Sequence, residues 1–165
     1  MGGLALDGKK ISRKKAESII EKVKEMGLEA ISKKWEVCGS FRRKKEEIGD
    51  LDIVLIPASL EDYQSWFESL DVEKFSSNLV DSILVEGVQV DFFVATKESY
   101  ATMIMTWTGS RGFNIVMRGK SFKAGYVYTR NGMYKRGESE VVKGLESEAD
   151  IFKLIGMPFV PPESR

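Results

Sequence analysis

The chain of 165 residues contains no histidine and only one cysteine, Cys38. The absence of histidine excludes a Ser-His-Asp triad, imidazole acid–base catalysis and most zinc sites. A single cysteine cannot form a disulfide within the chain and is typical of a reducing compartment, so we expect a cytoplasmic protein. Any catalysis must therefore use carboxylates, lysine, tyrosine, serine or a metal ion held by oxygen ligands.

Long apolar runs are missing as well. No stretch of about 18 apolar residues occurs, which argues against a transmembrane helix. The first residues, MGGLALDGKK, lack the basic-then-apolar order of a secretory signal peptide. The apolar fraction of 42% is enough to bury the core of one domain, or of two small subdomains that share an interface. We expect a monomer with no membrane partner.

Neither sign of charge is in excess, but the two signs are segregated along the chain. The net charge is +7 over residues 1–45, −11 over 46–100, +6 over 101–143 and −2 over 144–165. An acidic centre between basic arms can grip a polyanion while it holds cations in the middle. Ordinary solvated faces would explain the charges equally well if nothing else were known.

The spacing of apolar and turn residues predicts an α+β fold. Glu86-Gly87 and Asn131-Gly132 occupy hairpin positions between segments of alternating polarity. We predict a mixed or antiparallel sheet with helices on one face in residues 1–97, and a smaller α+β subdomain in residues 98–165. The predicted helices cover 13–26, Ser59 to Leu70, Thr96 to Trp107, a segment ending near Gly125 and a short one from Ser147; the predicted strands cover 35–38, 51–56, 79–85, 88–95, 126–130 and 133–136.

Three aspartates are expected to meet on one face of this sheet. In the strand 51–56, Asp50 and Asp52 fall on the face opposite to the apolar residues, and in the strand 88–95 Asp91 does the same. If both apolar faces meet one core, three carboxylates converge on the exposed side, where divalent cations would neutralise them. Mg²⁺ prefers a few carboxylates plus water and phosphate oxygens, and two such ions about 4 Å apart can serve in-line phosphoryl transfer.

The segment before these acids indicates a phosphate site. A strand that ends in Gly39-Ser40 leaves backbone N–H groups and a hydroxyl for phosphate oxygens, and glycine allows close approach. Arg43, with Arg42 as a second candidate, would clamp the same phosphates through a forked guanidinium group. The alternative is structural, because an Asp-x-Asp pair also occurs in simple turns before buried strands.

Five short motifs follow one another in a characteristic order. They are Gly39-Ser40-Phe41-Arg42-Arg43 with Gly49-Asp50-Leu51-Asp52; Val90-Asp91-Phe92-Phe93; Thr106-Trp107-Thr108-Gly109-Ser110; Phe113-Asn114 with Met117-Arg118; and the segment from Ile155 to Glu163. Together they resemble the family X DNA polymerases, the relatives of polymerase beta. The resemblance runs from about residue 10 to the C-terminus and implies a nucleotidyltransferase palm followed by a small C-terminal subdomain.

The resemblance implies a DNA-directed DNA polymerase that fills gaps in repair. Its partners would be dNTP and a nicked or gapped DNA primer-template, and its cofactor two Mg²⁺ ions, replaceable by Mn²⁺. Asp50 and Asp52 would hold both ions, and Asp91 would complete the site that activates the primer 3′-hydroxyl. The other contacts implied are Gly39, Ser40, Arg43 and Gly49 to the triphosphate, Trp107 and Gly109 to the sugar, Asn114 to the base edge and Arg118 to the template.

Two features depart from the family pattern. About 10 residues precede the matching region, which leaves no room for the family's N-terminal helical domain with its lyase lysine. We therefore expect no lyase activity and a minimal layout similar to that of the small viral members. The usual Tyr-Phe pair is Thr106-Trp107 here, which is more similar to the template-independent terminal transferases and implies relaxed selection against ribonucleotides.

Two other functions stay open on the sequence. A template-independent enzyme, or a nucleotidyltransferase acting on RNA or a small molecule, would keep the palm and change the acceptor. A non-catalytic DNA end-binding protein would keep the fold without the chemistry. Without the resemblance, Trp107 would be a core aromatic residue, and Asn114 and Arg118 would be ordinary surface residues on a helix.

Overall fold

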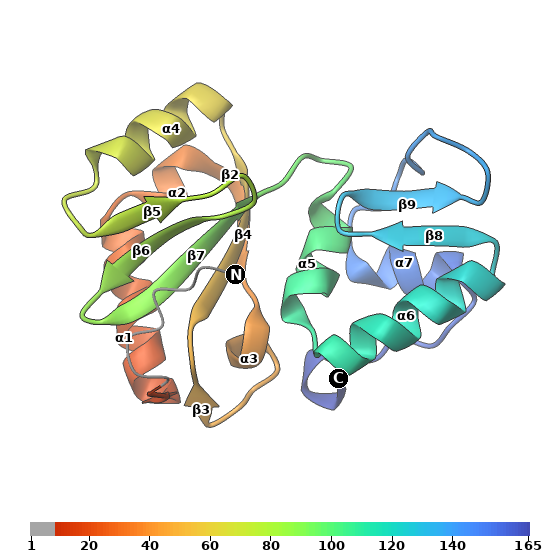
Figure 1. The fold of residues 1–165 in the computed structure, drawn as a ribbon, viewed down its shortest axis with the longest axis horizontal. Coiled ribbons are helices and arrows are strands. Elements are labelled where there is room, and N and C mark those ends of the chain that lie inside the picture. Colours follow the sequence, from red (N-terminus) through yellow and green to blue (C-terminus); the bar gives the residue numbers. More distant parts are fainter. Residues whose placement is uncertain (1–8) are drawn as a thin grey trace.

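The computed structural model describes residues 9–165 and places a five-stranded sheet beside a smaller unit of helices and one hairpin (Figure 1). The first eight residues, which bear on the signal-peptide argument and begin the expected range 1–97, lie outside the described residues. Within 9–165, every helix is too short or too polar to cross a membrane. The helices are α1 (Arg13–Glu25), α2 (Leu28–Ile31), α3 (Gly39–Arg42), α4 (Leu60–Ser69), α5 (Tyr100–Thr108), α6 (Arg111–Lys123), α7 (Glu148–Leu154) and the 3-10 turn η1 (Pro162–Ser164).

The strands form one mixed sheet and two small ribbons. They are β1 (Ile11–Ser12), β2 (Ser32–Val37), β3 (Glu47–Ile48), β4 (Leu51–Pro57), β5 (Lys74–Ser76), β6 (Asp81–Val85), β7 (Val88–Val94), β8 (Tyr126–Thr129) and β9 (Gly132–Lys135). The main sheet has the order β2-β4-β7-β6-β5, in which β4 and β7 are parallel and the other neighbours antiparallel. The α+β class with a mixed sheet is therefore confirmed.

One face of the main sheet packs against α1 and α4, on the side away from the C-terminal part of the chain (Figure 1). Capping residues set the starts of both helices. The Ser12 side chain accepts a hydrogen bond from the Lys15 backbone N–H, and the Ser59 side chain accepts one from the Asp62 backbone N–H. We call the resulting cluster the sheet core. Its fully buried members include Ile19 and Leu28, Leu51, Ile53 and Leu55 of β4, and Val90 of β7.

The other face of the sheet is covered by α5. Val54 of β4 and Phe93 of β7 pack there against Tyr100 and Ile104, a cluster that we call the α5 interface. The opposite side of α5 contributes Ala101 and Met105 to a separate C-terminal core. That core also contains Met117 and Met133, Tyr128, Ile151 and Phe152. The division expected near residue 98 stays a prediction, because α5 belongs to both environments.

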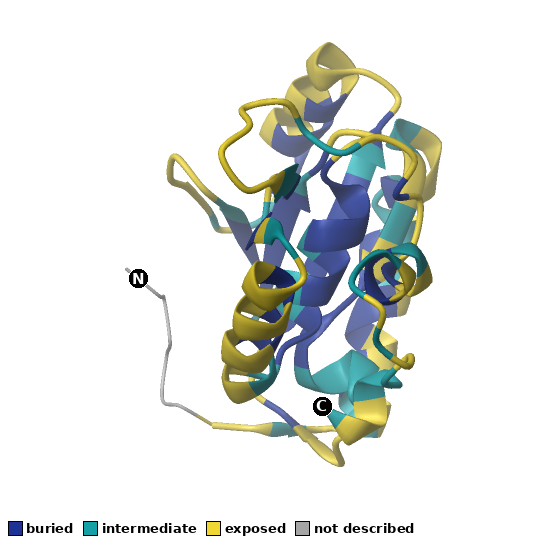
Figure 2. Cartoon of the chain, turned by 90° about the vertical axis from the view of Figure 1, so that its right-hand side faces the viewer, coloured by how far each residue is buried: buried dark blue, intermediate teal, exposed yellow. Residues whose placement is uncertain are grey.

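Several predicted elements differ from those in the structure. The strand predicted at 35–38 begins earlier, at Ser32, and ends before Cys38, which instead precedes α3. The strand predicted at 79–85 begins only at Asp81, and the helix predicted from Thr96 begins at Tyr100, after Ser99 as its N-cap. The short elements α2, α3, β1, β3 and β5 were not predicted, because two to four residues carry too little periodicity. Buried residues gather in the middle of the molecule and exposed ones on its outer helix faces and loops (Figure 2).

Candidate active site

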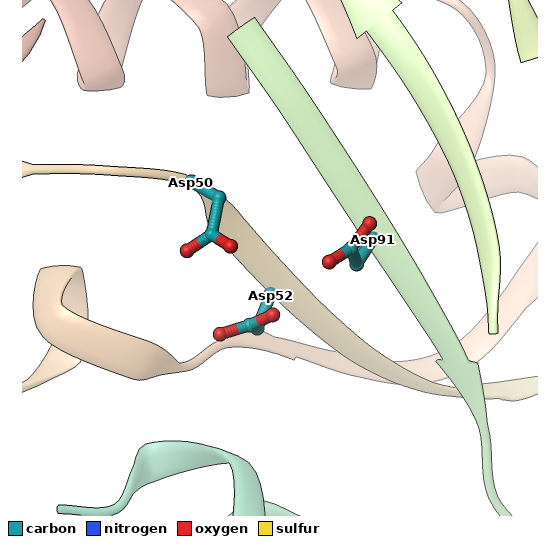
Figure 3. Close-up of side chains that lie close together, drawn as sticks. All are labelled: Asp50, Asp52 and Asp91. Atoms are coloured by element: carbon teal, nitrogen blue, oxygen red, sulfur yellow. The ribbon is translucent and has the colours of Figure 1, made fainter. Parts of the chain in front are cut away.

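The three aspartates are brought together by the pairing of β4 with β7. The two strands are parallel, and their register places Asp52 directly beside Asp91. Asp50 lies immediately before β4, on the same side as Asp52. One carboxylate oxygen from each of the three lies within 4.8 Å of those from the other two (Figure 3). Strand alternation thus places these acids as expected.

The surroundings of the acids correct one expectation. We expected all three on the exposed side of the sheet, but only Asp50 is exposed, while Asp52 is half-buried and Asp91 is buried with 9% of its surface accessible. The reason is that α5 covers this face of the sheet through Val54 and Phe93. The acids therefore occupy the end of a covered strip, where water is partly excluded and their mutual repulsion is screened less.

Crowding and burial make the acids hard to ionise together. Burial raises the pKa of Asp52 well above its usual value, and the charges of Asp50 and Asp91 raise it further, against a lowering by Arg43. Burial also raises the pKa of Asp50, with the Asp91 charge adding to it. Three carboxylate oxygens at this spacing are the hard ligands that Mg²⁺ or Mn²⁺ prefers, and a cation would relieve the repulsion. The residues present therefore fit divalent ions.

Asp91 is held by two further residues that were not among the predicted site residues. The Ser82 hydroxyl donates to Oδ1 of Asp91 at 2.6 Å, and the Gln89 side-chain amide donates to the same oxygen at 2.8 Å. Gln89 was visible on the same strand face as Asp91, two residues away. Ser82 could be found only from the register of β6 with β7, in which it faces Asp91.

Gly39 is required by the position of Asp52. Its backbone φ of 62° lies in the left-handed region, and a Cβ atom there would lie 2.7 Å from Oδ2 of Asp52. Gly39 begins α3, the four-residue helix that follows β2, so the Gly39-Ser40 step is a helical turn rather than the plain strand end that we predicted. The close approach explains the glycine without any ligand.

A cavity of about 630 Å³ adjoins this turn. Three of the four residues predicted to contact a triphosphate, Ser40, Arg43 and Gly49, line it. Lys10 and Lys45 line it too, although we had assigned no nucleotide contact to either. The walls also carry Glu46 and Glu47, so the cavity combines three cations with two carboxylates.

Arg43 links the cavity to the C-terminal part. Its Nη1 donates to the Thr108 carbonyl oxygen at 2.6 Å, and a Cβ atom at Gly109 would lie 3.1 Å from that Nη1. Gly109, with a φ of 70°, therefore leaves room for the guanidinium group. The buried Nε of Arg43 has no hydrogen-bond partner within residues 9–165, so the side chain retains an unused donor.

Arg42 does not contact the cavity that Arg43 lines. Its Nη1 donates to the Thr108 hydroxyl at 2.9 Å, and its Nη2 pairs with Glu148 of α7 at 2.6 Å. Glu148 also pairs with Arg165, whose side chain is fully buried. The suggestion that Arg42 clamps phosphates is therefore wrong for this structure, because the side chain joins α3 to the C-terminal part.

The candidate residues of α5 and α6 make contacts within the protein. Trp107 stacks on Phe93, with 3.8 Å between ring centroids and 16° between the planes. Asn114 is buried, and its side-chain amide donates to the Thr106 carbonyl oxygen at 2.8 Å. The Arg118 guanidinium lies over the Tyr128 ring at 5.6 Å. Each of these three side chains is therefore held by a neighbour within the protein.

Thr106 is turned toward the C-terminal core. Its hydroxyl donates to the Thr102 carbonyl oxygen at 2.7 Å and shares a hydrogen bond of 2.5 Å with the Tyr128 hydroxyl. Of the pair Thr106-Trp107, Trp107 alone therefore packs toward the sheet, through Phe93. Tyr128 was not among the predicted site residues, and no sequence signal connects it with Thr106.

Two models of known protein families match the chain. The model of the DNA polymerase beta palm matches residues 10–114, and that of the DNA polymerase beta thumb matches residues 103–165. The two matches overlap along α5 and the start of α6, the segment that packs against both cores.

The individual proteins to which the chain is similar are named as polymerases. The chain is 28% identical over 138 residues to the DNA polymerase/3′-5′ exonuclease PolX of Bacillus subtilis (strain 168), covering 80% of this chain and 24% of that protein. It is 26% identical over 160 residues to DNA polymerase lambda of Rattus norvegicus, covering 78% of this chain and 28% of that protein. The chain thus spans about a quarter of the length of these curated relatives. A crystal structure of Leishmania infantum polymerase beta in a ternary P/T complex has the same fold, with a TM-score of 0.75 and 24% identity over 95% of this chain and 77% of that one.

Proposed function

Because the chain belongs to the family X DNA polymerases, we propose that it is a DNA-directed DNA polymerase that adds nucleotides to a primer 3′-hydroxyl. The observation that carries this proposal is the convergence of Asp50, Asp52 and Asp91 within 4.8 Å, beside a cavity lined by Arg43 and two lysines. A non-catalytic end-binding protein would have no need to keep three repelling carboxylates together.

The acids would serve as ligands to divalent ions, Mg²⁺ with Mn²⁺ as a substitute. Asp50 and Asp52 would hold the ion that accompanies the incoming triphosphate, and all three acids the ion beside the primer end. What such ions supply when bound is positive charge next to the attacking oxygen and the transferred phosphate. Asp91, held at Oδ1, would keep its position while Asp50, the most exposed of the three, adapts to the incoming nucleotide.

The cavity beside Gly39 would take the triphosphate. Arg43 would bind phosphate oxygens through the donors that Thr108 leaves free, and the Ser40 hydroxyl and the backbone at Gly49 would add further hydrogen bonds. Lys10 and Lys45 would add positive charge at the cavity wall. These side chains would orient the triphosphate for in-line attack without taking part in bond breaking.

The end of α5 would hold the nucleoside. Trp107 and Gly109 would lie against the sugar, Asn114 against the minor-groove edge of the base and Arg118 against the template strand. Acceptors at that edge have similar positions in all correct pairs, so such contacts test geometry rather than sequence. Asn114 and Arg118 would first have to leave Thr106 and Tyr128, which makes nucleotide binding a rearrangement within α5 and α6.

We further propose gap filling on nicked or gapped DNA by a monomer, with residues 1–97 as the palm and 98–165 as the subdomain that binds nucleotide and template. Relaxed sugar selection is also proposed, since Thr106 is directed into the C-terminal core and leaves Trp107 as the aromatic residue on the nucleotide side. Comparing incorporation of matched dNTP and rNTP tests this point, and a preference of many thousandfold for dNTP would refute it.

Primer extension with purified protein tests the main proposal. Substrates with a nick, a short gap, an overhang and no template should be compared in Mg²⁺ and in Mn²⁺, and gapped DNA should be extended best. Extension only without a template would favour a terminal transferase, and no extension by folded protein would end the proposal. An Asp91→Ala variant should bind primer-template with the usual steep salt dependence yet lose extension by several orders of magnitude.

A further inference from the structure

Asp91 differs from the other two acids in how its carboxylate is held. Its Oδ1 accepts two hydrogen bonds, from Ser82 at 2.6 Å and from Gln89 at 2.8 Å. Within residues 9–165, no side chain of another residue donates to Asp50 or Asp52 in this way. Figure 3 shows one oxygen of Asp91 turned toward Asp50 and Asp52 and the other turned away from them. The carboxylate therefore has one oxygen held by the protein and one left for the cluster.

Both donors are anchored in the sheet rather than in a loop. Ser82 is buried in β6 and lies opposite Asp91 in the antiparallel register of β6 with β7. Gln89 lies two residues before Asp91 on the same face of β7. A side chain whose neighbours are fixed by the ladder keeps its rotamer before any ligand arrives, which is what an orienting partner must do.

The chemistry of the donors is also specific. A hydroxyl and a carboxamide hold a carboxylate without neutralising it, whereas an arginine or lysine in their place would compete with a cation. The negative charge of Asp91 therefore stays available to the space it shares with Asp50 and Asp52. Because Oδ1 already accepts two hydrogen bonds, only the second oxygen of Asp91 is left to bind a cation. The hydrogen bonds fix the direction in which that oxygen points.

We propose that Ser82 and Gln89 are positioning residues, which orient Asp91 and thereby set the affinity of the acidic cluster for divalent cations. The proposal rests on the proposed function for its catalytic consequence, since the ion held through Asp91 is the one assigned to the primer end. Its effect on cation binding can be measured without any polymerase reaction. The two residues touch neither nucleotide nor DNA in this scheme and act through Asp91.

Mn²⁺ binding followed by electron paramagnetic resonance, without nucleotide or DNA, is the direct test. Ser82→Ala and Gln89→Met each remove one donor, and each should weaken Mn²⁺ binding about tenfold, as outer partners of metal ligands typically do. Ser82→Thr restores a hydroxyl and should recover most of the affinity. In an Asp91→Asn background, Ser82→Ala should have no further effect. Ser121→Ala, which truncates a fully buried serine whose hydroxyl has no hydrogen-bond partner within residues 9–165, serves as the control.

The outcomes separate this inference from the proposed function. If folded Ser82→Ala and Gln89→Met bind Mn²⁺ as tightly as the wild type and Ser121→Ala do, the positioning role is refuted. If they bind it more weakly but the wild type extends no primer, the inference stands and the proposed function falls. Where extension occurs, the variants should lower kcat about tenfold at fixed Mg²⁺, leave the KM for dNTP unchanged and recover with added Mg²⁺. If Ser82→Ala fails to fold, Mn²⁺ binding by Gln89→Met decides whether the positioning role holds, because Gln89 is less buried than Ser82.

Discussion

The five-stranded sheet and the C-terminal part place their candidate site residues by different means. In the sheet, strand pairing sets Asp52 beside Asp91, and the backbone ladder would have to break for the acids to separate. In the C-terminal part, Trp107, Asn114 and Arg118 each rest on a neighbouring aromatic ring or carbonyl group that they can leave without unfolding a helix. The comparison suggests that the candidate cation site is rigid and that the candidate nucleotide site is adjustable.

The sheet core is also more rigid in composition than the C-terminal core. The sheet core is built from branched aliphatic residues and aromatic rings, with Trp66 packed edge-on against Phe92 at 5.4 Å. The C-terminal core contains three fully buried methionines, Met105, Met117 and Met133. Methionine is unbranched and adapts to changes in packing more easily than isoleucine or valine. A core of this composition can absorb small movements of α5 and α6 that the sheet core would resist.

Between the two regions lies a buried polar group that ties them together. Glu148 of α7 accepts from Arg42 on the sheet side and from Arg165 near the C-terminus, and the Arg165 guanidinium also lies 5.1 Å from the Phe113 ring centroid. If Glu148 were removed, Arg165 would lose its acidic partner, and Arg42 would keep only the longer pair with Glu36 at 3.8 Å. The largest effect that we expect therefore comes from this position.

Replacing Glu148 by glutamine should destabilise the protein by about 3–5 kcal/mol, because it leaves the buried Arg165 without a counter-charge and leaves the half-buried Arg42 with Glu36 alone, at 3.8 Å. Urea unfolding followed by circular dichroism measures this loss. Glu146→Gln, an exposed glutamate in the same segment whose side chain makes no ion pair within residues 9–165, should change stability little. Equal stability of the two variants would show that the contact between the regions does not depend on the ion pairs.

On the sheet side, the sharpest test is Gly39→Ala. The new Cβ atom would lie 2.7 Å from Oδ2 of Asp52 in a left-handed backbone conformation, so either the turn or the carboxylate must shift. A shift of about 1 Å at a reacting centre typically costs on the order of 100-fold in rate, and we expect a loss of primer extension of that size. The left-handed conformation should add about 1–2 kcal/mol of destabilisation.

Gly49→Ala is the matched control for stability, because no atom of residues 9–165 outside its two chain neighbours lies within 4 Å of its Cβ position and its backbone is not left-handed. It should unfold at nearly the wild-type temperature. If Gly39→Ala retained full primer extension and stability, the close approach to Asp52 would have no consequence, and the acidic cluster would not be rigid.

The features that could be predicted from the sequence are those that depend on residues close to one another along the chain. The convergence of Asp50, Asp52 and Asp91 was predictable because strand alternation has a period of two and both strands carry strong apolar faces. Capping residues located the starts of α1 and α4 for the same local reason. These signals act over a few residues, whereas the pairing of β4 with β7 that brings the acids together had to be assumed from the two apolar faces.

The missed features depend on contacts between distant segments. Ser82 meets Asp91 only through the register of β6 with β7, and Arg42 meets Glu148 only after α7 has docked. The cover that α5 places over the sheet also follows from tertiary packing, so the burial of Asp91 could not be anticipated from its strand alone. For this reason Arg42, a basic residue beside the Gly39-Ser40 step, was easily mistaken for a phosphate ligand.

The rigid acidic cluster should make stability depend on pH in an unusual direction. Burial and the neighbouring carboxylates raise the pKa of Asp52 in the folded protein, so the ionised form penalises folding at neutral pH. The penalty should shrink as pH falls through the raised pKa and vanish below the ordinary value of 3.8. As the pH falls from 7 toward 3.8, metal-free protein should thus gain about 2–4 °C in Tm for each kcal/mol by which the Asp52 penalty is relieved.

Calorimetry of the wild type and Asp52→Asn in chelator, and again in Mg²⁺, isolates this contribution from the other acids. Without metal, Asp52→Asn should have the higher Tm at pH 7, and the difference in Tm should narrow as the pH falls toward 3.8. In Mg²⁺ the wild type should recover at pH 7. A difference that is independent of both pH and Mg²⁺ would mean that the acids do not repel one another strongly.

The smallest effect is expected for Tyr128→Phe, which removes the hydroxyl that meets Thr106. The lost hydrogen bond should cost about 1 kcal/mol, and burial, which raises the pKa of Tyr128 to about 12, keeps the hydroxyl a donor at all working pH values. Tyr134→Phe, on the neighbouring strand and with no side-chain hydrogen bond within residues 9–165, should cost less. Neither variant should alter the ratio of rNTP to dNTP incorporation. Thr106 is directed away from the sheet, so it should not reach the nucleotide. If Tyr128→Phe alone changed the ratio of rNTP to dNTP incorporation tenfold, Thr106 would have to reach the nucleotide. The adjustable part of the site would then include the contact to the sugar.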